Sequence, residues 1–150
     1  MKFLRCLYFN SVLFCLSCYY FSIAFVRLLF ESQDKVVHWV TTSWGGAVLK
    51  HAGISIELHG KEYLSMTPAI FVSNHQSMLD LFMMCKIMPF KTRGIAKQSL
   101  RWIPFLGWFM KLSGAIFIDR YHKEQALEAM KEARKMIERG YSMMIAPEGT

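Results

Sequence analysis

Residues 71–80 read FVSNHQSMLD, and they contain the change from strand to helix that decides the fold. Residues 68–72 form a short, wholly apolar run, as a central strand of a parallel sheet does. Ser73 and Asn74 are typical of turns and helix caps. The apolar residues 79–88 then suit a helix, which a proline ends. The stretch therefore predicts strand, turn and helix in succession, which is the repeating element of an α/β fold.

The same alternation continues toward the end of the chain. The pattern predicts further strands over residues 54–58, 93–97, 114–120 and 141–146, and helices over residues 99–112 and 123–139. Ser99 is the expected N-cap of the first of these helices, and Pro104 should kink or restart it. One face of the last helix should carry Leu127, Met130, Ala133 and Ile137. We therefore expect an α/β domain over residues 51–150, with a mostly parallel sheet and flanking helices.

The N-terminal part of the chain differs in character from the rest. Residues 6–26 carry no charge, and a helix of that length crosses a bilayer, which needs about 20 residues. Residues 22–24 would also suit signal-peptide cleavage, but the run is long for a signal peptide, which favours a retained anchor. Basic residues flank both ends, so charge does not decide the orientation. A helix embedded in one leaflet remains the alternative.

A second apolar pattern follows this run. Apolar residues recur at helical spacing between residues 36 and 49, and Trp39 and Trp44 are residue types that suit the headgroup level of a membrane. The pair Gly45 and Gly46 weakens the case for one continuous helix. Residues 1–50 are therefore expected to form a membrane-associating hairpin or pair of helices.

The composition supports a membrane partner. The 150 residues are 53% hydrophobic and carry a formal net charge of +7, so an apolar boundary with anions is the expected environment. The basic residues are scattered and show no zinc-finger or RNP-like pattern, which argues against nucleic acid. Of the four cysteines, Cys15 and Cys18 have C-x-x-C spacing, but they lie in an apolar run without a nearby histidine. We therefore expect no metal site, no cofactor and no disulfide framework, as in a reducing compartment.

His75 and Asp80 are the candidate catalytic pair. Five residues of continuous helix would leave them about 140° apart, so they meet only if His75 lies in the turn and Asp80 in the first turns of the helix. A carboxylate bonded to one ring nitrogen fixes the tautomer and makes the other nitrogen a better base. The alternative is a turn histidine that bonds backbone, with Asp80 as a charge at a helix start.

No nucleophile accompanies this pair. Ser77 lacks a G-x-S-x-G elbow, and Cys85 lies among apolar neighbours in the predicted helix. If His75 is catalytic, the hydroxyl that it deprotonates belongs to the substrate. The residues therefore predict direct transfer without a covalent acyl-enzyme.

Polar residues at the ends of the predicted strands are candidates for anion binding, because ligands gather there in open α/β sheets. Arginine is the fork-shaped partner of phosphate, and a glycine turn exposes backbone N–H groups to it. Glu148 could hold a basic residue or bond a substrate hydroxyl. The other candidates are Arg93, Lys97, Arg120, Gly149 and Thr150.

Three ordered stretches resemble motifs of the 1-acylglycerol-3-phosphate acyltransferase family of glycerolipid acyltransferases. They are NHQSMLD (74–80), GAIFIDR (114–120) and PEGT (147–150), and AKQSLRWIPFLGWFM (96–110) resembles the segment that links the first two. The resemblance covers residues 54–150 and implies the glycerolipid acyltransferase fold. It implies His75 as base, Asp80 as its orienting partner, Asn74 with the binding residues, Arg120 at the acceptor phosphate, and Glu148 and Gly149 in the acceptor-binding motif.

The family resemblance also implies a reaction and its partners. The acyl donor would be acyl-CoA or acyl carrier protein, the acceptor lysophosphatidic acid and the product phosphatidic acid, with the site facing the cytoplasm beside the membrane. Acylation of glycerol 3-phosphate or another lysophospholipid, and an inactive membrane-binding module, are the alternatives. The sequence stops at Thr150, before the end of the third motif and before the fourth, which predicts an incomplete catalytic domain over residues 51–150.

The remaining histidines and aromatic residues have simpler interpretations. His38 is expected at the membrane interface and the others on the surface, none with a carboxylate at useful spacing; they are His51, His59 and His122. The aromatic stripe should line an acyl-chain channel or, equally, serve core packing or membrane contact; it comprises Trp102, Phe105, Trp108 and Phe109.

Overall fold

The computed structural model describes residues 2–103, 106–119 and 121–146 and divides the chain into two compact units. The first, the helical unit, comprises Met1–His59 and Ser77–Met88. The second, the sheet unit, comprises Gly60–Gln76 and Pro89–Thr150. The helix that follows the first strand, within Ser77–Met88, therefore groups with the N-terminal helices, although the expected boundary near residue 50 assigned it to the α/β domain. The assignment of an anchor and a catalytic domain stays a prediction.

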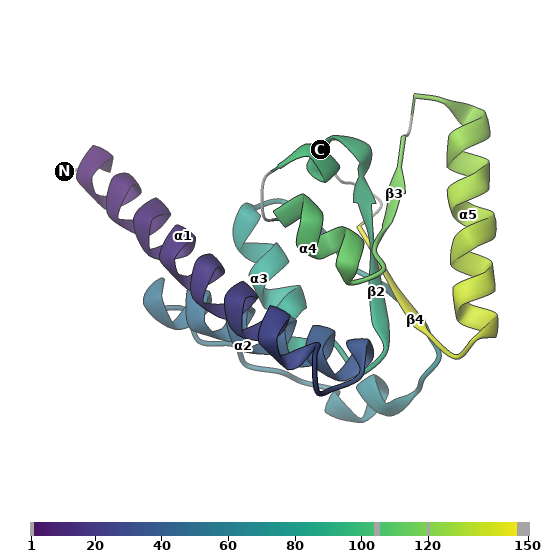
Figure 1. The fold of residues 1–150 in the computed structure, drawn as a ribbon, viewed down its shortest axis with the longest axis horizontal. Coiled ribbons are helices and arrows are strands. Elements are labelled where there is room, and N and C mark those ends of the chain that lie inside the picture. The colour runs from purple at the N-terminus through teal and green to yellow at the C-terminus, as the bar shows by residue number, and fades with distance from the viewer. Residues whose placement is uncertain (1, 104–105, 120, 147–150) are drawn as a thin grey trace. The chain divides into compact units, whose positions relative to one another are not determined.

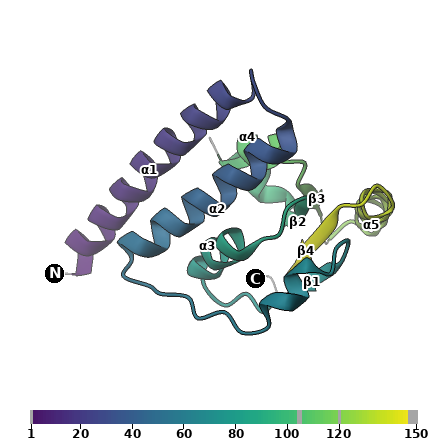
Figure 2. The same cartoon turned by 90° about the horizontal axis from the view of Figure 1, so that it is seen from below.

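The helical unit is a helix hairpin with a third helix packed on it. Helices α1 (Lys2–Arg27) and α2 (Gln33–His51) lie side by side, and α3 (Met78–Ile87) packs against α2 (Figures 1 and 2). Contacts such as Tyr20 to Trp39, 5.8 Å between ring centroids, confirm the predicted pair of helices. Residues 3–27 of α1 are long and apolar enough to cross a membrane, with a mean hydropathy of 1.7, and only 6% of the tested window is buried.

The expectation that Trp44 lies at the headgroup level requires a side chain on the surface, and Trp44 is buried instead. It is 5% exposed, and its ring packs between Phe21 and Phe82 at centroid distances of 5.7 and 5.1 Å. Its indole N–H donates to the Ser17 hydroxyl over 3.2 Å, which satisfies the polar edge of a buried ring. Trp44 thus joins all three helices of the helical unit.

The glycine pair of α2 does not interrupt the helix, which is continuous from Gln33 to His51. A Cβ atom on Gly45 would lie 2.7 Å from the Phe82 carbonyl oxygen and 2.9 Å from the Cys85 Cβ. The glycine therefore lets α2 and α3 approach closely, and tertiary packing outweighs its low helix propensity.

The strand predicted over residues 54–58 is wrong, because these residues pair with no strand and have no regular secondary structure. Burial does alternate along them, which explains the pattern in the sequence. Gly53 ends the preceding helix in the left-handed region with a φ of 69°, and Ile54 N–H then donates to Leu49 C=O over 2.9 Å. The segment therefore covers the helices without joining a sheet.

The sheet unit contains the predicted parallel sheet. Its strands are β1 (Ile70–Val72), β2 (Thr92–Lys97), β3 (Ile116–Ile118) and β4 (Ser142–Ile145). They are arranged in the order β1-β4-β2-β3, and each pair is parallel (Figure 2). The connection after β2 leads to β3 at the edge of the sheet, whereas the connection after β3 leads back to β4. Because both crossovers are expected to be right-handed, the two connections should run over opposite faces of the sheet.

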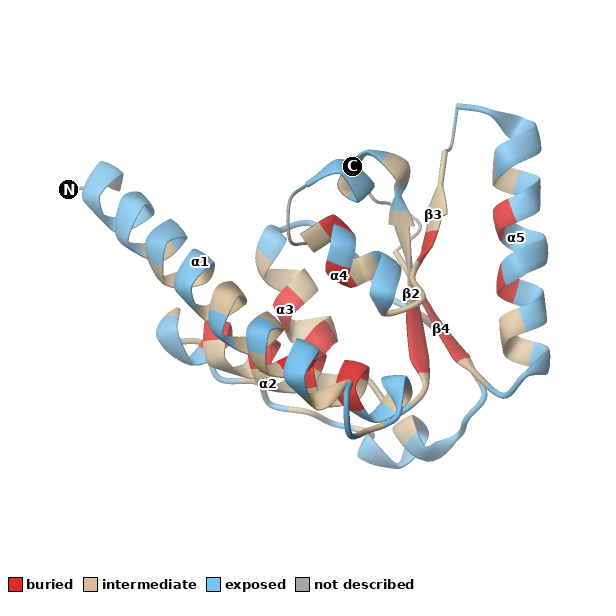
Figure 3. Cartoon of the chain, viewed as in Figure 1, coloured by how far each residue is buried: buried red, intermediate tan, exposed pale blue. Residues whose placement is uncertain are grey.

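Helix α5 (Lys123–Glu138) covers one face of the sheet and makes its core there. The buried cluster comprises Ile116, Ala129, Ala133 and Met143 (Figure 3). The face predicted from the sequence is only partly right, since Leu127 is 57% and Met130 39% exposed. The face toward the sheet is instead formed by Ala129 and Ala133 with Met136 and Ile137 packed beside them.

The helix predicted over residues 99–112 is two elements. A 3₁₀ helix, η2 (Gln98–Trp102), precedes α4 (Leu106–Leu112), and Ser99 lies inside η2, so it is not an N-cap. A Cβ atom on Gly107 would clash with the Arg101 carbonyl oxygen, which shows how closely the two elements pack. A further 3₁₀ helix, η1 (Lys61–Ser65), precedes β1.

Candidate active site

His75 is placed by the end of β1. The backbone N–H of Ser73 donates to the Ile145 carbonyl over 3.1 Å, so pairing with β4 continues one residue beyond the strand. His75 follows two residues later and is half-buried. It therefore lies just beyond the carboxyl edge of a parallel sheet, where active sites of α/β proteins form.

Asp80 is placed by the N-terminus of α3. Its carboxylate accepts a hydrogen bond from the Ser77 backbone N–H over 2.7 Å, while the Ser77 hydroxyl accepts one from Leu79 N–H over 3.1 Å. This is a capping box with Ser77 at the N-cap and Asp80 at position N3. The expectation that Ser73 and Asn74 cap the helix is therefore wrong, although Ser77-Met-Leu-Asp80 has the spacing that would have identified the true cap.

The two predicted catalytic residues lie on either side of the junction between the units. His75 belongs to the sheet unit and Asp80 to the helical unit, with the junction between Gln76 and Ser77. Five residues of chain can separate two Cα atoms by at most about 18 Å, so the chain itself keeps the two residues near one another. Their pairing stays a prediction.

The strand register relates Lys97 to the first motif. Val72 pairs with Ile145, and Ile95 pairs with Ile116. Because Gly94 pairs with Met144, the next residues, Ile95 and Ile145, lie at one level, so one row crosses all four strands. Two residues further along the chain, Lys97 ends β2 while Asn74 lies in the turn after β1, and both are exposed. Since β4 lies between β1 and β2, these two strands are about 10 Å apart.

Arg93 lies at the opposite end of the sheet from Lys97. It is the second residue of β2, pairs with Met143 and is only 5% exposed. Its guanidinium carbon lies 4.7 Å from the centre of the Tyr141 ring, and Nη1 donates to the Thr92 carbonyl over 3.2 Å. The expectation that Arg93 belongs with the residues at the ligand-binding edge is therefore wrong in its position.

Four predicted site residues lie outside the part of the chain that the structure describes: Arg120, Glu148, Gly149 and Thr150. The residue before the first of them, Asp119, accepts hydrogen bonds from Tyr121 N–H and from His122 Nδ1, each over 2.9 Å. The backbone hydrogen bond, and then that of the histidine, lower the pKa of Asp119. Sequence reasoning missed this pair of an aspartate and a histidine, and it also missed the pair of His59 and Glu57, whose Nε2 and Oε1 atoms are 3.1 Å apart.

The two side chains considered as nucleophiles have other roles. Burial raises the pKa of the Cys85 thiol to about 12, so the thiol is protonated at neutral pH. The Ser77 hydroxyl is the helix cap. Both observations agree with a reaction in which the substrate supplies the attacking oxygen.

The aromatic stripe predicted for an acyl channel is divided between surface and core. Trp102 is 79% and Trp108 68% exposed, whereas Phe109 is buried, and Phe105 lies outside the described residues. The described residues contain no group of three His, Cys, Asp or Glu side chains that could hold a metal ion.

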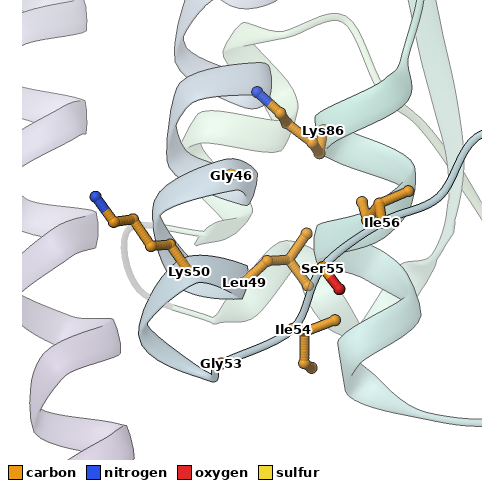
Figure 4. Close-up of a pocket in the computed structure, with 8 residues that line it drawn as sticks. All are labelled: Gly46, Leu49, Lys50, Gly53, Ile54, Ser55, Ile56 and Lys86. Atoms are coloured by element: carbon orange, nitrogen blue, oxygen red, sulfur yellow. The ribbon is translucent and has the colours of Figure 1, made fainter.

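A groove of about 390 Å³ lies within the helical unit, but none of the predicted site residues lines it. Leu49, Ile54 and Ile56 provide apolar surface, and Lys50 and Lys86 extend outward from its rim (Figure 4). We therefore keep the candidate site at the carboxyl edge of the sheet.

Comparison with known proteins supports this fold. The chain matches a crystal structure of the 1-acyl-sn-glycerophosphate (LPA) acyltransferase PlsC from Thermotoga maritima with a TM-score of 0.77 and 23% identity, over 100% of this chain and 63% of that one. At this identity the match supports the architecture, namely the N-terminal helices followed by the parallel sheet.

Sequence relatives are closer in identity. A 1-acyl-sn-glycerol-3-phosphate acyltransferase of Saccharomyces cerevisiae is 34% identical over 88% of this chain and 44% of its own length. The enzyme of that name from Limnanthes alba is 40% identical over 71% of this chain and 38% of its own. The chain thus spans less than half the length of these two curated relatives. A family model described as Acyltransferase matches residues 55–150, and the chain belongs to this acyltransferase family.

Proposed function

We propose that this protein is an O-acyltransferase that moves a fatty acyl chain from a thioester to the free hydroxyl of 1-acylglycerol 3-phosphate, giving phosphatidic acid. The observation that carries the proposal is the position of His75, two residues after the last backbone pairing of β1 and five residues before the Asp80 of the α3 cap. The names of the relatives support the choice of acceptor.

In the proposed reaction, His75 acts as general base. One ring nitrogen takes the proton of the acceptor hydroxyl as its oxygen attacks the thioester carbonyl carbon. The tetrahedral intermediate then collapses, the C–S bond breaks, and the departing thiolate takes the proton from the imidazolium. Asp80 orients the ring and balances its transient positive charge, and no acyl group is carried by the protein.

The acceptor phosphate would be held at the end of β2. Lys97 is exposed there and is paired with Ile118 of β3, and Arg120 follows in the sequence by two residues. Connections leave these two strands on opposite faces, and such a switch point is the usual ligand crevice of an open α/β sheet. Asn74, Glu148, Gly149 and Thr150 would complete the acceptor site.

The expected location follows from the substrates. The lysolipid resides in a membrane, whereas acyl-CoA and acyl carrier protein are cytosolic, so the site should face the cytoplasm beside the leaflet. Helix α1 would anchor the protein, either across the bilayer or within one leaflet. Protease or thiol labelling of sealed vesicles tests the sidedness, and placement of the His75 region on the outer side would exclude a cytosolic donor.

A panel of acceptors tests the substrate directly. The full-length protein is supplied with an acyl thioester and, in separate reactions, with lysophosphatidic acid, glycerol 3-phosphate, other lysophospholipids or an uncharged monoacylglycerol. We expect the highest kcat/KM with lysophosphatidic acid. Equal turnover of the uncharged acceptor would refute phosphate recognition, and no turnover of any acceptor would favour the inactive membrane-binding module.

A further inference from the structure

The surface of η2 and α4 has no role in the proposed reaction, yet it exposes two of the four tryptophans of the chain. Trp102 is 79%, Trp108 68%, Ile103 43% and Leu112 40% exposed. Tryptophan side chains are large and apolar with one polar edge, so their exposure to water alone is unfavourable. An exposed apolar group of this kind usually marks an interaction site.

Local packing gathers these side chains. Gly107 of α4 lies against the backbone of Leu100 and Arg101, and its N–H donates to the Ile103 carbonyl over 2.8 Å. This close contact brings together the backbones of the two elements that carry the exposed Trp102 and Trp108. On α4, Leu112 is one turn after Trp108, while the buried Gly107 and Phe109 face inward.

The charge of this surface is of one sign. Residues 89–118 contain five Lys or Arg residues and no Asp or Glu. Arg101 and Lys111 are exposed on the same two elements as the tryptophans. Aromatic side chains that prefer the headgroup level, together with cations, are complementary to an anionic phospholipid surface.

We propose that the interfacial surface, formed by Arg101, Trp102, Ile103, Trp108, Lys111 and Leu112, docks the sheet unit on the anionic headgroups of a bilayer. The two tryptophans and Leu112 enter the interfacial layer, and the two cations pair with lipid phosphates. This contact is separate from α1 and needs no acyl transfer. A basic residue near an anionic surface strengthens binding by about fivefold, so the two cations together contribute about 25-fold.

Hydroxyl-radical footprinting with mass spectrometry tests this contact in the presence of α1. The full chain is reconstituted in nanodiscs of either zwitterionic lipid or a mixture with anionic lipid, and side-chain oxidation is measured residue by residue. We expect Trp102 and Trp108 to be oxidised several-fold more slowly in the anionic discs. Tyr63 and Tyr121, which are 65% and 86% exposed elsewhere on the sheet unit, should react equally in both.

Charge variants give the matched control. Arg101→Gln with Lys111→Gln should abolish the difference between the discs, whereas Lys123→Gln with Lys131→Gln on α5, the same change in net charge, should leave it. Equal oxidation of both tryptophans in the two discs, or an equal effect of the two variant pairs, would overturn the proposal. Protection found only in discs that contain two copies would assign the surface to a second chain and also overturn it.

Discussion

The Asp80 carboxylate accepts a 2.7 Å hydrogen bond from the backbone N–H of Ser77, which fixes the carboxylate at the start of α3, five residues after His75. The charge of Asp80 therefore has two functions in this account. It completes the helix cap and, in the proposed reaction, it orients the imidazole. Substitutions that separate the cap from the charge distinguish these functions.

Asp80→Asn should lower kcat strongly while the protein stays folded, because the amide oxygen still accepts the Ser77 N–H but the negative charge is lost. Ser77→Ala should have the opposite effect: removal of an N-cap hydroxyl costs about 1 kcal/mol of stability, and turnover of the folded protein should change little. Steady-state kinetics and thermal unfolding of both variants measure the two effects. Equal losses of kcat in the two variants would mean that Asp80 acts only through the cap.

Gly45→Ala should destabilise the helical unit, because its Cβ would meet the Phe82 carbonyl oxygen at 2.7 Å. Overpacking of this kind costs about 1–3 kcal/mol. Gly46→Ala is the matched control, since the atoms nearest to a Cβ there belong to the flexible Lys86 side chain, the first at 3.1 Å. Thermal unfolding in the same detergent should give a lower Tm for the first variant alone, and equal Tm values would contradict the observed helix packing.

These glycines also show what sequence reasoning could not supply. The alternation of strands and helices, the parallel sheet and the hairpin of α1 and α2 follow from local patterns, and the structure confirms them. The sequence could not show that α3 packs against the backbone of α2 at Gly45, so a contact glycine was interpreted as a helix breaker. Likewise, alternation over residues 54–58 reports burial on one side, whereas a strand also needs a pairing partner.

The candidate site was predictable in part for similar reasons. The position of His75 follows from the strand-turn pattern, and Lys97 ends its strand as expected. Arg93 was misplaced although the sequence placed it at the start of a predicted strand: in a parallel sheet that is the amino edge, whereas ligands gather at the carboxyl edge, where Lys97 lies. The capping role of Ser77 and the pairing of Asp119 with His122 have local spacing signals that can be recognised in a sequence.

Cys85 should be inert to thiol reagents in the folded protein. It is buried, and its pKa of about 12 leaves almost no thiolate at pH values near 8. Cys6 and Cys15 are exposed on α1 and should react before Cys85 wherever the detergent leaves this helix accessible. Mass spectrometry after brief alkylation, with and without denaturant, measures this order, and rapid labelling of Cys85 without denaturant would contradict the packing of α2 on α3.

Asp119 should make the start of α5 sensitive to acid. Its pKa is lowered in the folded state, so its stabilising contribution is complete above the ordinary pKa of an aspartate and is lost as the pH falls through the lowered value. Amide protection factors in the first turn of α5 should therefore be constant above about pH 5 and decrease as the pH falls below about 4. Asp119→Asn should remove most of this decrease, and an identical pH dependence in both proteins would refute the role of Asp119.

The most direct test of the account is the rate of acyl transfer from a labelled acyl thioester to lysophosphatidic acid by His75→Ala, compared with the unchanged protein. Loss of a positioned general base lowers the rate by about 10² to 10⁴, and we expect a loss of this size while membrane association and Tm are retained. Ser77→Ala and Cys85→Ala, assayed beside it, should change the rate of acyl transfer only slightly, because neither side chain carries the acyl group. A His75→Ala protein that turns over within a few-fold of the unchanged one, or an acyl group trapped on Ser77 or Cys85, would contradict direct transfer by His75.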